Sequence, residues 1–100
     1  MINEHEHINV QFEKRGREIS NRLLHDFQLA AKEIDREKNE YLFRQSKDKY
    51  VNTLKANLQT IALELLHHNQ ANRQIKGIDQ HLNHLIKEEL HQFVQKLNSL

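Results

Sequence analysis

The apolar pattern of residues 51–68 constrains the fold of this chain more than any other sequence feature. Apolar side chains recur there at steps of three and four, at Val51, Leu54, Leu58, Ile61 and Leu65. This spacing places them along one face of an α-helix. The apolar arc is wider than one seam requires, because it also includes Ala62, Leu63 and Leu66. We therefore expect a central helix with neighbours on two sides.

Two further apolar stripes flank this segment. The first predicts a helix over residues 10–45 and consists of Phe12, Ile19, Leu23, Phe27, Ala30, Ile34 and Tyr41. The second predicts a helix over residues 78–98 and consists of Ile78, Leu82, Leu85, Ile86, Leu90, Phe93, Val94, Leu97 and Leu100. Because residues 1–9 lack sustained periodicity, we predict a flexible lead-in over 1–9 and a single helical domain over 10–100.

The chain contains no proline and only two glycines, a composition that favours helices. The apolar pattern lapses weakly at 44–49, where Ser46 or Asp48 is a candidate helix cap. It lapses more strongly at 67–77, where Gly77 precedes a candidate cap at Asp79. We therefore predict an all-α fold, a small up-down-up three-helix bundle. The alternative is a long helical hairpin, with 50–98 as one helix, that dimerises into a four-helix bundle.

Size and charge limit the classes of partner. With 100 residues, of which 37% are hydrophobic, a single copy has little material for a core, so we expect a homo-oligomer. The formal net charge of +1 provides no general attraction to nucleic acid or to an anionic membrane. Cysteine is absent, which excludes disulfides and thiolate chemistry. We find neither a signal-peptide pattern nor a membrane-spanning apolar run, and we expect a cytoplasmic protein.

Two E-x-x-H pairs are the candidate metal ligands, Glu64 with His67 and Glu88 with His91. Di-iron helical bundles use this spacing, because side chains at i and i+3 share a helix face. However, the motif is short, the chain is rich in Glu and His, and both pairs lie off the apolar seams. We predict no metal and no cofactor, and we keep a metal-binding helical bundle as an alternative function. The imidazoles that share a face of the last helix with Glu88 are the next candidates, His81, His84 and His91.

The basic residues give a weak indication of nucleic-acid binding. Their one cluster, Lys14, Arg15, Arg17 and Arg22, is interleaved with Glu13 and Glu18. The local excess is therefore small for a nucleic-acid surface, and no helix-turn-helix spacing accompanies it. A phage-type or plasmid-type nucleic-acid accessory factor remains a second alternative. We also predict that the chain is not an enzyme, because it has neither a Gly-rich phosphate loop nor a nucleophile elbow.

Six apolar residues lie beside the main seams and are our predicted partner-binding residues, Leu42, Phe43, Leu63, Leu66, Ile86 and Val94. Such residues either widen the core or form a groove for another helix. We predict a non-enzymatic helical interaction module, adaptor or chaperone-like, that binds another protein by helix-on-helix packing. His68 occupies a seam position, and protonation of a buried histidine is disfavoured, so we also expect association and stability to weaken as the pH falls.

Overall fold

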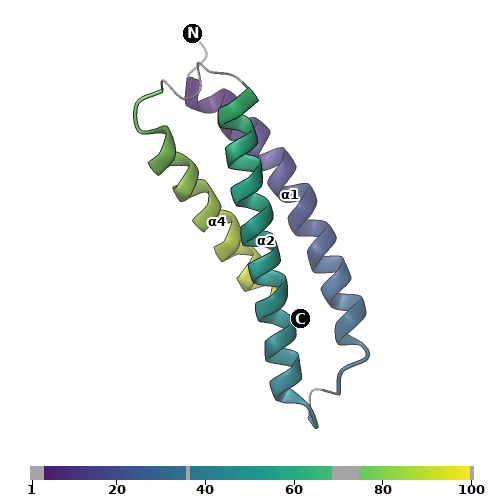
Figure 1. Ribbon diagram of the computed structural model, residues 1–100. Coiled ribbons are helices and arrows are strands. Elements are labelled where there is room, and N and C mark those ends of the chain that lie inside the picture. Colours follow the sequence, from purple (N-terminus) through teal and green to yellow (C-terminus); the bar gives the residue numbers. More distant parts are fainter. Residues whose placement is uncertain (1–3, 36, 69–74, 100) are drawn as a thin grey trace.

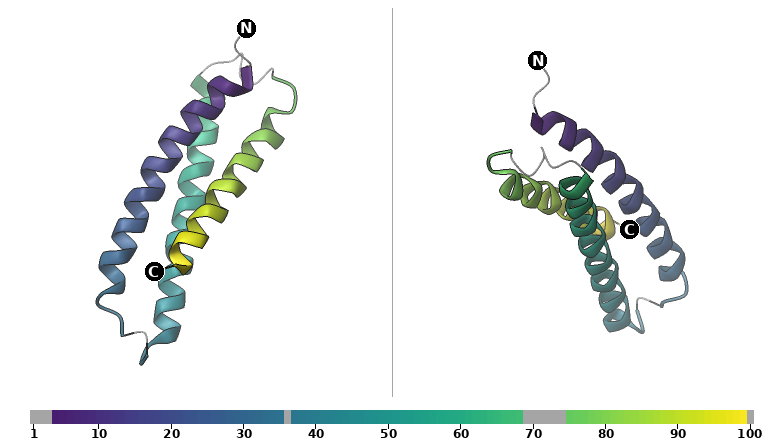
Figure 2. Two further views of the ribbon diagram at one scale, coloured as in Figure 1. Left: turned by 180° about the vertical axis from the view of Figure 1, so that it is seen from behind. Right: turned by 45° about the horizontal axis from the view of Figure 1, so that its top comes forward.

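The computed structural model describes residues 4–35, 37–68 and 75–99, and the side chains within these ranges except those of 4–6 and 68. Over these residues the chain forms three α-helices, α1 (Glu4–Ala31), α2 (Glu40–His68) and α4 (Ile78–Asn98). The chain direction alternates from one helix to the next (Figure 1). Each helix contacts the other two, and the turned views show all three side by side (Figure 2). The predicted all-α three-helix bundle is confirmed.

The central stripe of α2 forms the middle of the core. Leu54, Leu58, Ile61 and Leu65 are buried, and Val51 packs against them at the core edge. The other two helices contribute Ile8, Phe12, Leu23 and Phe27 from α1, and Ile78, Leu82, Leu85, Ile86, Phe93 and Leu97 from α4. The 3.6-residue period thus predicted which face of each helix is buried.

Gly16 allows α1 to pack closely against α2. A Cβ at this position would lie 3.1 Å from Leu58 Cδ2 and 3.9 Å from Glu89 Cγ of α4. Gly16 is itself buried, as is Ser20 one turn later. The sequence pattern treated Gly16 as a gap in the apolar stripe, whereas in the bundle the missing side chain makes room for Leu58.

The predicted helix over 10–45 is wrong at its end, because the chain turns between Ala31 and Glu40. The carboxylate of Asp35 accepts hydrogen bonds from the backbone N–H groups of Glu37, at 3.0 Å, and Lys38, at 3.4 Å. The carbonyl of Asn39 accepts the N–H of Phe43 at 3.1 Å, which makes Asn39 the N-cap of α2. The weak break predicted at 44–49 therefore lies inside α2, and Tyr41 of the predicted stripe is 72% exposed.

The N-terminal part of α1 also differs from the prediction. The lead-in predicted over 1–9 is helical from Glu4 onwards. Ile8 is 1% exposed and belongs to the core, which explains why the helix extends this far. Ile8 is the one apolar residue between Glu4 and Asn9, which was too weak a periodic signal to predict this.

The second break was predicted correctly in position. α2 ends at His68 and α4 begins at Ile78. The alternative with one helix over 50–98 is therefore wrong, and the helix predicted over 78–98 is confirmed. Gly77 has φ +75°, a left-handed conformation that glycine adopts without steric cost. Its carbonyl accepts the N–H of His81 at 3.0 Å, so Gly77, rather than Asp79, is the N-cap of α4. Residues 69–74 of the predicted turn lie outside the described residues.

The helices differ in length, so the bundle is not uniform from end to end. With 29 residues α2 is about 43 Å long, whereas α4 with 21 residues is about 31 Å long. The Lys47 ammonium donates a hydrogen bond to the Asn98 side chain at 3.2 Å, and α4 ends there. The end of the bundle formed by 24–31 and 40–46 therefore consists of α1 and α2 (Figure 1). None of the three helices, within the described ranges, has an apolar run of the length that a membrane crossing requires.

Candidate interaction surface

A groove between α2 and α4 is the candidate functional site. It has a volume of about 360 Å³ and is lined by Gln59, Ala62, Leu63 and Leu66 from α2 and by Asp79, Leu82, Asn83 and Ile86 from α4. Leu63 is 56% exposed at its margin, whereas Ala62, Leu82 and Ile86 form its buried floor. The site is therefore an apolar channel with a polar margin, which is the form that receives the apolar face of another helix.

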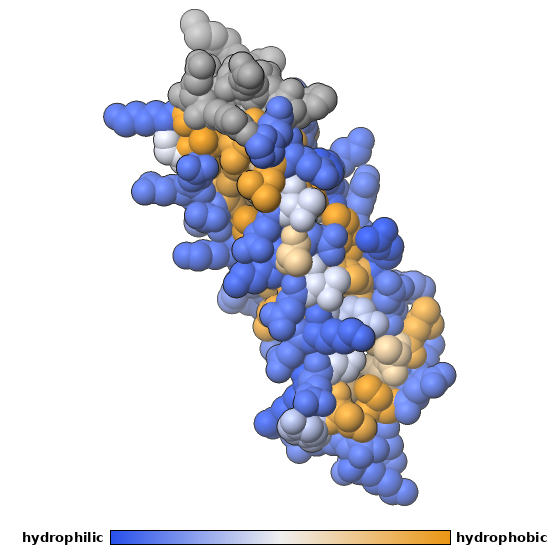
Figure 3. Space-filling model, in the orientation of Figure 1, coloured by the Kyte–Doolittle hydropathy of each residue, from blue (hydrophilic) through white to orange (hydrophobic). Residues whose placement is uncertain are grey.

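The groove lies beside the apolar seam of α2, where Leu63 and Leu66 extend the apolar face toward α4. The seam residues Leu58, Ile61 and Leu65 are used within the bundle, while Leu63 and Leu66 face the side on which α4 lies. On the space-filling surface, hydrophobic side chains gather between α2 and α4 toward the end at which α4 begins (Figure 3). A second gathering lies at the opposite end, where α1 meets α2 (Figure 3).

The structure brings three of the six predicted partner-binding residues together, because Leu63, Leu66 and Ile86 line the same groove. Val94 is half-buried. It lies eight residues, or two steps of four, after Ile86 and therefore on the same face of α4. Leu42 and Phe43 lie about 30 Å away along α2 and do not join this site. Leu42 is 50% exposed, but Phe43 is buried, with its ring centroid 5.6 Å from that of Phe27. Phe43 and Ile86 are equally buried, each 7% exposed, and both belong to the core while lining a hollow.

The second hollow lies at the two-helix end. It has a volume of about 380 Å³ and is lined by His25, Gln28, Leu29, Ala31, Lys32, Ile34 and Phe43. Leu29 is 51% exposed at its margin. Its lining contains the cation Lys32 and the imidazole of His25, and no carboxylate.

The two E-x-x-H pairs lie on different helices and have other contacts. Glu64 forms an ion pair with Arg15, and both side chains are about half exposed. Glu88 lies 3.0 Å from the imidazole Nε2 of His84, and His91 Nε2 lies 3.1 Å from the side-chain amide of Gln95. Within the described residues no three His, Asp or Glu side chains gather as a metal site would require.

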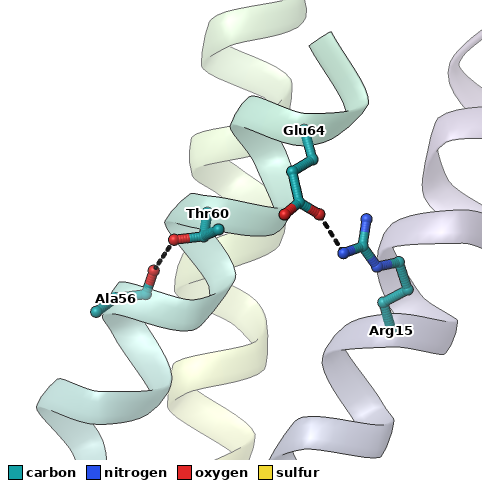
Figure 4. Close-up of polar contacts among 4 residues, drawn as sticks. All are labelled: Arg15, Ala56, Thr60 and Glu64. Carbon is teal, nitrogen blue, oxygen red and sulfur yellow. Dashed lines mark hydrogen bonds and ion pairs between the residues drawn. The ribbon is translucent and has the colours of Figure 1, made fainter. Parts of the chain in front are cut away.

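The Arg15–Glu64 pair joins α1 to α2 on the surface. The two side chains point toward each other across the space between the helices (Figure 4). One turn before Glu64, the Thr60 hydroxyl donates to the carbonyl of Ala56 at 3.0 Å, within its own helix (Figure 4). An exposed ion pair of this kind contributes less than about 1 kcal/mol to the free energy of unfolding, because water screens the two charges. Arg15 of the predicted basic cluster is thus neutralised locally.

The histidines of α4 do not form one exposed face. His81 hydrogen-bonds the side-chain oxygen of Asn9 and thereby joins α4 to α1. His84 and His91 are exposed. The side chain of His68, the predicted buried histidine, lies outside the described residues.

Sequence reasoning did not find the polar margin of the groove. Gln59, Asp79 and Asn83 lie there, on two helices whose relative rotation the sequence does not specify. Their spacing does carry a signal, since Asp79 and Asn83 are one turn apart on the side of α4 that also bears Ile86. Comparison of the chain with protein families, curated proteins and solved structures finds no match.

Proposed function

We propose that this chain is a non-enzymatic, cytoplasmic helical interaction module, adaptor or chaperone-like, that binds a partner helix in the α2–α4 groove. The observation that carries the proposal is the apolar groove itself, with Leu63 half exposed beside Leu66 and Ile86. A leucine whose side chain is 56% exposed at the margin of an apolar channel gains from being covered by another apolar side chain. The groove follows about two turns of each helix, over 59–66 and 79–86, and a partner helix would lie along it.

The partner helix is expected to be amphipathic. Its apolar residues would recur at i, i+3 or i+4, and i+7, so that one face fills the groove and the other stays in water. Carboxamides at the groove margin, from Gln59 and Asn83, would orient it by hydrogen bonds. Such a role needs no catalytic group and no cofactor.

A photo-crosslinking experiment in the native host tests this function. A photoreactive residue is placed at position 63 and, as a matched control, at position 29, because Leu29 is 51% exposed but lines the other hollow. We expect a defined crosslinked product from position 63 that position 29 does not give. Circular dichroism of each variant establishes that the bundle is intact. Equal crosslinking from both positions, or none from position 63, contradicts the proposal.

Binding is then measured with the crosslinked segment as a synthetic peptide. Leu63→Asp is expected to weaken its affinity at least about tenfold, since a charge replaces an apolar contact at the centre of the interface. Leu29→Asp is expected to leave the affinity unchanged.

A further inference from the structure

We propose that the hollow at the two-helix end binds a small amphipathic anion, a carboxylate on an alkyl chain of medium length. The site is separate from the α2–α4 groove, because Phe43 in its lining is about 30 Å from Leu63 along α2. The inference therefore adds a ligand site to the protein-binding surface and does not depend on that surface.

The hollow is formed by two helices and the turn that joins them. The side chains that line it at 25, 28, 29 and 32 are spaced so that they lie along one side of the end of α1. Ile34 lines it from the turn, and Phe43 lines it from α2. α4 ends beside Lys47 and contributes no lining residue.

The apolar part of the lining is large enough for a small molecule. The hollow has a volume of about 380 Å³, within the range of roughly 300–1,000 Å³ that is typical of small-molecule sites. Leu29 is 51% exposed and Ile34 is half-buried, so both retain apolar surface that a ligand can cover. The buried Phe43 ring packs against Phe27, which gives the hollow a wall that exists before a ligand binds.

The polar part of the lining favours an anion. Lys32 provides an ammonium group, and the lining contains no carboxylate. Within the described residues Lys32 forms no ion pair, so its charge is available to a ligand. Gln28 and His25 can donate N–H groups to a second carboxylate oxygen. A carboxylate at Lys32, with its alkyl chain along Leu29, therefore complements both parts of the lining.

The charged groups around the hollow do not reverse this preference. The Asp35 carboxylate already accepts hydrogen bonds from two backbone N–H groups of its own turn. Asp26 and Glu33 do not line the hollow. The Lys47 ammonium lies 4.7 Å from the centroid of the Phe43 ring and brings a second cation to this end of the bundle.

The position of the turn favours a small molecule over a partner helix. Because Ile34 of the turn lines the hollow, the hollow ends where the chain reverses direction. A helix with its side chains is about 10–12 Å wide and continues in both directions, so it needs a groove that is open at both ends. An alkyl carboxylate can enter from one side.

Isothermal titration calorimetry of the full chain with octanoate, below its micelle concentration, tests the inference. We expect one molecule to bind per chain, with a dissociation constant on the order of 0.1 mM. Octanol, which lacks the charge, is expected to bind at least about threefold more weakly. Octylamine, which has the opposite charge, is expected to bind at least about tenfold more weakly. Absence of octanoate binding overturns the inference, and so does equal binding of the three ligands.

Variants of the lining locate the site. Lys32→Glu is expected to raise the dissociation constant of octanoate at least about tenfold and to leave that of octanol unchanged, because it places like charges together. Leu29→Asp is expected to weaken octanoate to a similar extent. Leu63→Asp is the matched control, since it replaces a leucine of similar exposure in the α2–α4 groove, and it should have no effect. Unchanged octanoate affinity in Lys32→Glu overturns the inference, as does a loss in Leu63→Asp equal to that in Leu29→Asp.

The photo-crosslinking experiment distinguishes a small molecule from a protein in this hollow. A defined product between position 29 and another protein overturns the small-molecule occupant and assigns the hollow to a partner chain. The two proposals fail separately. Loss of the octanoate result leaves the crosslink from position 63 standing, and absence of that crosslink leaves octanoate binding at Lys32 standing.

Discussion

Gly16 and Leu58 show how a single absent side chain sets the separation of two helices. A helical glycine ordinarily costs about 1 kcal/mol relative to alanine, so its presence inside α1 requires compensation. The compensation is the approach of Leu58, whose Cδ2 would lie 3.1 Å from a Cβ at this position. Side-chain packing and helix propensity therefore oppose each other at residue 16.

Enlarging Gly16 should separate the two effects. We expect Gly16→Leu to lower the free energy of unfolding by roughly 1–3 kcal/mol, because the new side chain must displace Leu58. Gly16→Ala should change it by less than about 1 kcal/mol, since the gain in helix propensity offsets the close contact. Urea titrations measure both variants. Ala56→Leu is the control, because Ala56 is exposed on α2, and a change there as large as at residue 16 would contradict this account.

At the scale of the element, the turn between α1 and α2 shows how polar side chains end a helix without glycine or proline. The Asp35 carboxylate accepts two backbone N–H groups that have left the helical pattern. The backbone of Asn39 then begins α2. Aspartate and asparagine favour such turns because their side chains compete with the helical hydrogen bonds.

Removing the Asp35 carboxylate should weaken this turn. We expect Asp35→Ala to lower the free energy of unfolding by about 1 kcal/mol, because two backbone donors lose their acceptor. Asp35→Asn retains an oxygen acceptor and should lose less than half of that. Asp26→Ala, at an exposed position inside α1, is the matched control, and denaturant melts compare the three. If Asp35→Asn were as destabilising as Asp35→Ala, charge and not hydrogen bonding would hold the turn.

At the scale of the whole molecule, the bundle has three helices over most of its length and two at one end. The core residues Leu54, Leu58 and Ile61 are enclosed by all three helices, whereas 40–46 extend past the end of α4. Local stability follows the number of apolar contacts that a segment makes. The cluster of Phe27, Phe43 and Tyr50 is the main packing at the two-helix end, with ring centroids 5.6 Å apart.

Hydrogen exchange should reveal this difference along α2. We expect the backbone amides of 44–47 to exchange faster than those of 58–65, although both segments lie inside the same helix. Peptide-resolved mass spectrometry measures the two rates in one sample, so α2 provides its own control. Equal protection along the helix would mean that the aromatic cluster stabilises the two-helix end as strongly as α4 stabilises the rest.

The sequence by itself determined that the chain is helical and, for the middle of each helix, which face is buried, but it misplaced the start of α1 and the turn between α1 and α2. This follows from the period of the apolar residues, a local property that does not depend on what lies opposite. Leu65 and Leu63 illustrate the limit of that information. The apolar stripe predicted that Leu65 belongs to the core, and Leu65 is buried. For Leu63 the stripe did not decide between a wider core and a binding surface.

Only the tertiary structure decided whether the residues beside the seams are buried or exposed. Whether Phe43, Leu63 or Ile86 is covered depends on where the neighbouring helix begins, how it is rotated and where it ends, and these follow from packing among all three helices. The turn at Asp35 and the close packing of Leu58 against Gly16 also follow from packing among the helices. Each balances a weak local preference against contacts with residues far away in the sequence, such as Leu58 for Gly16. The groove between α2 and α4 is the product of that packing.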